Sequence, residues 1–103
     1  MLVQVNTDRN IEGSERLEAY FSQQITESFA RFDEQITRVE LHLSDENGAK
    51  EVGEDKKCVM EVKLKGLNPV AVTSHAETIQ AAVKLATNKL KSTLEKTIGH
   101  HRV

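Results

Sequence analysis

The last third of the chain constrains the fold most, because residues 78–98 have the pattern of one long amphipathic helix. Apolar residues recur there at spacings of three and four, as in a helix with one buried side. They are Ile79, Ala82, Val83, Ala86, Leu90, Leu94 and Ile98. A helix with such a stripe must pack on an apolar surface that the rest of the chain provides.

The preceding residues predict a sheet and a second helix. Val3 and Val5 alternate with polar residues, as in a half-buried strand. Residues 14–32 repeat the helical pattern, with Ser14 as the expected N-cap and with all three phenylalanines and Tyr20 on the side that should be buried. Residues 36–44, 58–65 and 70–73 alternate apolar and polar residues or are rich in valine, so they predict three further strands.

This order predicts a two-layer α+β sandwich, β-α-β-β-β-α, formed by a four-stranded mixed sheet with two helices packed on one face. The first strand should lie parallel to the second, because a helix connects them. A chain of 103 residues is long enough for one core, so we expect a single domain over residues 1–103. We expect a polar loop over residues 45–57, which carries Gly48 and Gly53.

The expected cellular compartment follows from the absence of membrane-spanning and secretory patterns in the sequence. No apolar run approaches the roughly 20 residues of a membrane span, and the amino terminus does not resemble a secretory signal. Cys58 is the only cysteine, which fits a reducing compartment. We therefore expect a cytoplasmic protein with no membrane partner.

Charge is divided unevenly along the chain. Residues 1–55 contain 13 acidic and 5 basic residues, whereas residues 56–103 contain 3 acidic and 9 basic residues. A basic surface from the second half could meet a polyanion, or the two halves could neutralise each other across the fold. The overall net charge of -2 is compatible with both readings.

The basic residues of the last helix have a regular spacing. Two pairs are seven residues apart, so each pair should lie on one flank of the helix; Arg102 would continue one row, and two lysines of the third strand would add charge. The candidate RNA-binding residues are Lys84, Lys89, Lys91, Lys96, Arg102, Lys63 and Lys65. Such lysines suit contact with nucleic-acid phosphates, although an ordinary solvated helix face has the same composition.

No pattern in the sequence predicts an enzyme or a metal site. The serines lack a nucleophile-elbow motif, there is no glycine-rich phosphate loop, and Cys58 falls on the strand face expected in the core. The acidic run after Asp45 has Lys50 where a calcium loop requires glycine. We therefore expect no catalytic residue, no metal, no cofactor and no small-molecule substrate.

The element order, the residues Val-Glu-Leu-His-Leu-Ser at 39–44 and the run from Ala81 to Leu94 resemble the ribosome hibernation-promoting factor and ribosome-associated inhibitor family. The resemblance covers essentially the whole chain and corresponds to the short form of the family. Lys89 matches the lysine of the family's Lys-Leu-x-Arg-Gln-Leu motif, whereas Ser92 stands where that motif has arginine.

The resemblance implies a fold related to double-stranded-RNA-binding domains and a function without catalysis. Family members bind the small ribosomal subunit in the channel used by messenger and transfer RNA, and so silence and protect idle ribosomes. It implies a bacterial stress-response protein whose partner is small-subunit ribosomal RNA. The alternative is a divergent member that acts as a protein-interaction module through its acidic first half and the 45–57 loop.

Overall fold

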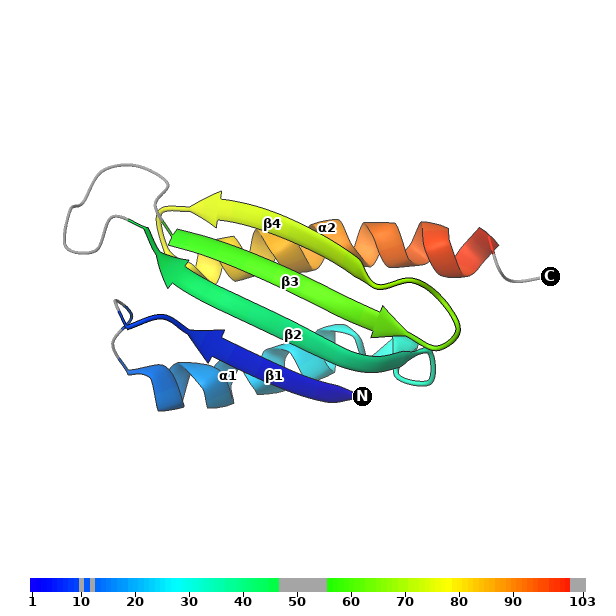
Figure 1. Ribbon diagram of the computed structural model, residues 1–103, viewed down its shortest axis with the longest axis horizontal. Helices are drawn as coiled ribbons and strands as arrows, with labels where there is room; N and C mark the ends of the chain where they lie inside the picture. The colour runs from blue at the N-terminus through cyan, green and yellow to red at the C-terminus, as the bar shows by residue number, and fades with distance from the viewer. Residues whose placement is uncertain (10, 12, 47–55, 101–103) are drawn as a thin grey trace.

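The computed structural model describes residues 1–9, 11, 13–46 and 56–100. Its elements, in chain order, are β1 (Leu2–Thr7), α1 (Ser14–Ser28), the short 3-10 helix η1 (Ala30–Phe32), β2 (Ile36–Asp45), β3 (Lys56–Leu64), β4 (Val70–Ala76) and α2 (Ile79–His100). The strands form one sheet in the order β1-β2-β3-β4, and both helices lie on the same side of it (Figure 1). β1 is parallel to β2, and β3 is antiparallel to β2 and β4. The predicted two-layer α+β fold with a mixed sheet is confirmed.

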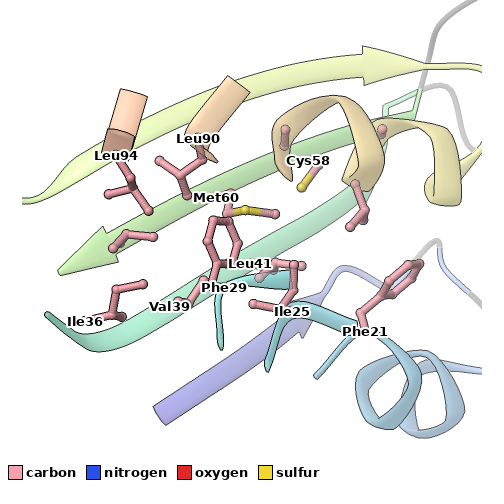
Figure 2. Packing of buried hydrophobic residues seen from close by; sticks show 14 of the residues in the cluster. Phe21, Ile25, Phe29, Ile36, Val39, Leu41, Cys58, Met60, Leu90 and Leu94 are labelled. Atoms are coloured by element: carbon pink, nitrogen blue, oxygen red, sulfur yellow. The ribbon is translucent and has the colours of Figure 1, made fainter. Parts of the chain in front are cut away.

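The core lies between the sheet and the two helices. Strand alternation places one set of side chains under the helices, and each is at most 2% exposed: Val39, Leu41, Leu43, Cys58, Met60 and Val62. Figure 2 shows Phe29, at the end of α1, and Leu90, on α2, converging near Met60 in the middle of this layer. The helical stripes predicted from spacing are therefore the surfaces that cover the sheet.

Helix α1 differs from the prediction at both ends. Gly13 is the N-cap, with φ of 69°, and Ser14 is the first helical residue, so the expectation that Ser14 caps the helix is wrong. Glycine suits this position because the left-handed region is costly for residues that carry a Cβ. The helix ends at Ser28, and η1 then brings Phe32 into the core, so residues 14–32 are two short elements rather than one helix.

Tyr20 does not join the core, contrary to expectation. It is 48% exposed, whereas its neighbour Phe21 is 1% exposed. Consecutive helical residues point about 100° apart, so burying Phe21 turns Tyr20 toward the surface. There its hydroxyl accepts a hydrogen bond from Gln24 Nε2 at 2.8 Å.

Helix α2 is fixed at its start by short side chains. Thr78 Oγ1 accepts a hydrogen bond from the Ala81 N–H at 3.1 Å, as an N-cap does. The buried Ser74 hydroxyl, on β4, donates to the Ala82 carbonyl at 2.6 Å, which ties the strand to the first turn of the helix. These contacts set the rotation of α2 about its axis, and hence the direction of its lysines.

The polar loop is shorter than expected. Asp45 belongs to β2 and Lys56 and Lys57 belong to β3, because the β2–β3 ladder continues to the pair Asp45–Lys56. Lys56 Nζ lies 3.2 Å from the mostly buried Asp45 carboxylate. Residues 47–55, which include both expected loop glycines, lie outside the described residues. Among the described residues, no helix is long and apolar enough to cross a membrane.

Candidate nucleic-acid interface

The lysines of α2 form two rows, one on each side of the exposed ridge of the helix. At about 100° per residue, Lys84 and Lys91 share one flank, and Lys89 and Lys96 share a flank about 140° away. The buried stripe lies on the opposite side of the helix from the line midway between the two rows. The rows are therefore placed symmetrically on either side of the most exposed line of the helix. Lys91 is half-buried and the other three are exposed. The predicted pairing of these lysines by spacing therefore agrees with the observed helix.

The row of Lys89 and Lys96 lies on the side of β4. Lys89 Nζ donates a hydrogen bond to the carbonyl of Thr73 at 3.1 Å. Thr73 is in β4, the edge strand, so the lysine covers a main-chain acceptor that no strand pairs with. The bond partner is neutral, and Lys89 keeps its positive charge at the surface.

The row of Lys84 and Lys91 lies on the flank that also carries Glu95. Glu95 is four residues after Lys91 and forms an ion pair with Arg31 of η1. Arg31 in turn lies over the ring of Phe32, with its guanidinium carbon 4.6 Å from the ring centroid. This flank therefore has a further cation, Arg31, whose charge is offset by Glu95. Spacing within α2 could not reveal Arg31, because it belongs to another element.

The remaining candidates do not lie in these rows. Lys63 is exposed on the open face of the sheet, in register with Arg38, and Lys65 follows β3 on the way to β4. The backbone N–H of Lys65 donates to the Gln35 carbonyl at 2.9 Å. Arg102 lies outside the described residues. The structure thus brings four of the seven candidates together on α2 and places Lys63 on the opposite side of the molecule.

The open sheet face has mixed charge. Glu40 and Glu61 are directly opposite each other in the β2–β3 ladder. Arg38 Nε is 3.3 Å from the Glu40 carboxylate, and His42 Nε2 is 3.6 Å from the same group. This pairing leaves less net positive charge there than on α2, so α2 is the stronger candidate for phosphate contact.

The structure also places the residues considered for chemistry. Burial raises the pKa of the Cys58 thiol from 9.0 to about 12, so the thiol is protonated and inert near neutral pH. His75 Nε2 lies 3.1 Å from Glu46 Oε1. Among the described residues, no three of His, Cys, Asp and Glu gather as metal ligands would.

These features define an α+β fold whose second helix, α2, carries two rows of lysines. A family model described as Sigma 54 modulation protein / S30EA ribosomal protein matches residues 4–102. The chain therefore belongs to this ribosome-associated family, as the resemblance in its sequence predicted.

Two solved structures have the same fold. One is the N-terminal domain of Protein Y from Thermus thermophilus, with a TM-score of 0.70 and 19% identity, covering 94% of this chain and 99% of that one. The other is a ribosomal subunit interface protein from Coxiella burnetii, with a TM-score of 0.68 and 18% identity, covering 96% of this chain and 99% of that one. A comparison with curated proteins finds no match.

Proposed function

We propose that this protein is a ribosome-associated translation silencer, which binds small-subunit ribosomal RNA through α2 and excludes transfer and messenger RNA. The observation that carries the proposal is the pair of lysine rows along α2, in a chain that belongs to a ribosome-associated family. Lys84, Lys89, Lys91 and Lys96 are the main contacts. Lys63, Lys65 and Arg102 are secondary contacts.

The arrangement suits a helix that lies along a groove between two stretches of phosphate backbone. Each lysine row would then approach one stretch, while the ridge between the rows, which carries the exposed Leu85, Asn88 and Ser92, faces the floor of the groove. Lysines act there as point charges that need no exact geometry, which fits flexible, exposed side chains. Phosphate contacts fix position and supply affinity without reading the base sequence.

Silencing by this route requires no catalytic residue. A rigid domain that occupies the space of transfer and messenger RNA excludes them, and occupancy follows mass action between the competing molecules. The affinity depends on counterion release, so it must fall as salt rises. The protein would therefore act on ribosomes whose competing ligands are scarce and would be displaced when these become abundant.

The decisive experiment is co-sedimentation of the purified protein with small ribosomal subunits over a series of salt concentrations. We expect binding at low salt that weakens steeply as salt rises. We also expect transfer RNA to compete with the protein for the subunit. Binding that is independent of salt, or that transfer RNA does not affect, would contradict the proposal.

The alternative, a protein-interaction module that uses the acidic first half and the 45–57 loop, makes a different prediction. Deletions within residues 47–55 would abolish the interaction and leave RNA binding intact. The described ends of this segment are already paired within the molecule, Asp45 with Lys56 and Glu46 with Lys57. This internal pairing offsets the charge of Asp45 and Glu46, which favours the RNA-binding proposal.

A further inference from the structure

A second surface lies on the other side of the molecule from the lysine row that borders β4. A groove of about 550 Å³ runs between β1 and α1. One wall is formed by residues 3–6 of β1, and the other by Glu15, Glu18, Ala19 and Ser22 of α1. We propose that this groove binds an extended, lysine- or arginine-rich segment of another protein as an added fifth strand, independently of RNA binding by α2.

The free edge of β1 provides the main-chain part of the site. β1 is a terminal strand of the sheet, paired only with β2 among the described strands. The N–H of Asp8 donates to the Leu43 carbonyl of β2 at 3.0 Å, so the backbone of residue 8 faces β2. Backbone direction alternates along a strand, and the N–H and C=O groups of Val3 and Val5 must therefore face away from β2. Both valines line the groove.

The two edges of the sheet are not equivalent. On β4, the opposite edge, Lys89 bonds to the outward carbonyl of Thr73. Charged lysines at an edge strand are a common protection against unwanted strand pairing. β1 itself carries no charged residue, since its sequence is Leu-Val-Gln-Val-Asn-Thr. The β1 edge is therefore suited to strand addition, in which main-chain bonds supply affinity.

The side chains of the groove determine which segment fits. Glu15 and Glu18 are three residues apart on α1, so they lie on the same flank, and none of the described residues that line the groove is basic. An added strand would direct every second side chain toward α1, at intervals of about 6.6 Å. Lysines or arginines at two alternate positions could each reach one carboxylate. A second copy of this chain is a poorer occupant, because β1-to-β1 pairing would bring four glutamates together.

The test uses an eight-residue peptide of alternating lysine and threonine, titrated into the isotope-labelled protein and followed by NMR. We expect shifts of the amides of residues 3–6 and of the first turns of α1. The double variant Glu15→Gln and Glu18→Gln should weaken binding by about fivefold to tenfold, as expected for the loss of two solvent-accessible ion pairs. Ala19→Trp, which fills the groove without changing its charge, should abolish the shifts.

Matched controls separate strand addition from diffuse attraction. The variant Glu27→Gln and Glu34→Gln removes the same charge outside the groove and should leave the affinity nearly unchanged. A peptide with alternate N-methylated backbone amides retains its charge and should bind at least tenfold more weakly. Any of four results would overturn the proposal. The two double variants could weaken binding equally, or the methylated peptide could bind as tightly as the unmodified one. The peptide could also fail to bind at all, or the protein could form a dimer through β1 that excludes the peptide.

Discussion

The lysine rows of α2 allow a quantitative test of the proposed RNA contact. Three variants each remove two positive charges: Lys84→Gln with Lys91→Gln, Lys89→Gln with Lys96→Gln, and Lys63→Gln with Lys65→Gln. The first two remove one row each, and the third removes the two secondary contacts of the sheet, for which we expect a smaller effect than for either row. All three have the same net charge, so differences between them report position.

The expected effect follows from counterion release. Each phosphate contact contributes roughly 0.7 to 0.9 to the slope of log K against log salt concentration, so loss of one row should reduce the slope by about 1.4 to 1.8. The ratio of the affinity at 50 mM salt to the affinity at 200 mM salt should therefore be about 7- to 12-fold smaller for such a variant than for the unmodified protein. Loss of both rows should remove about twice as much from the slope.

The assay is titration of the labelled protein with small ribosomal subunits at four or more salt concentrations. Thermal unfolding should accompany it, because Lys89→Gln also removes the bond to Thr73, a loss of about 1 kcal/mol at most for an exposed hydrogen bond. If neither row changes the slope, or if the sheet pair changes it as much as a row does, then α2 is not the RNA-contacting element.

Four further changes test the site and the fold. Ser92→Arg adds a cation between the rows and should raise the salt slope by about 0.7 to 0.9, measured in the same titration; an unchanged slope would argue against contact at the ridge. Phe29→Ala should lower the free energy of unfolding by about 3–5 kcal/mol in urea denaturation, and a loss below 1 kcal/mol would contradict its central place in the core. Gly13→Ala should cost roughly 1 kcal/mol, because alanine is strained at φ of 69° although its Cβ would meet open space; an unchanged stability would refute this. Because the pKa of Cys58 is raised in the folded protein, the unfolded chain loses the thiol proton at lower pH than the folded chain does. The free energy of unfolding should therefore fall between pH 9 and pH 12, by up to about 1.4 kcal/mol per pH unit. In urea denaturation over the same pH range, Cys58→Ala should lack this component, and an identical pH dependence of the two proteins would contradict the reasoning.

Periodicity predicted those parts of the fold that depend on one buried face. The alternation of Val39, Leu41 and Leu43 and the helical stripe around Leu90 correspond directly to the observed core. Periodicity could not place Tyr20, because an aromatic residue at the border of a stripe can face either way and the packing of Phe21 decides. Strand ends were also missed, since the extension of β4 to Ala76 depends on its pairing with Lys56 of a distant strand.

The candidate site was predictable only where one element carries it. Spacing within α2 was sufficient to pair Lys84 with Lys91 and Lys89 with Lys96. Contacts between elements could not be deduced from spacing, as with Arg31, which reaches Glu95 from η1, or Lys89, which covers the edge of β4. For the same reason, spacing could not show that Lys63 lies on the face of the sheet away from α2, because this depends on which face the helices cover.

The pairing of β1 also has a consequence for how this chain is made. Every β1–β2 pair joins residues 36 positions apart, from Leu2 with Arg38 to Thr7 with Leu43, whereas Asp45 pairs with Lys56 and Val62 with Val70 across much shorter intervals. Because β1 is synthesised before β2, it cannot pair with β2 until β2 has emerged, and closing this longer loop costs more conformational entropy than forming the later hairpins. β1 is therefore the strand whose placement must wait during assembly, while β2, β3 and β4 can each pair with the neighbouring strand as it appears.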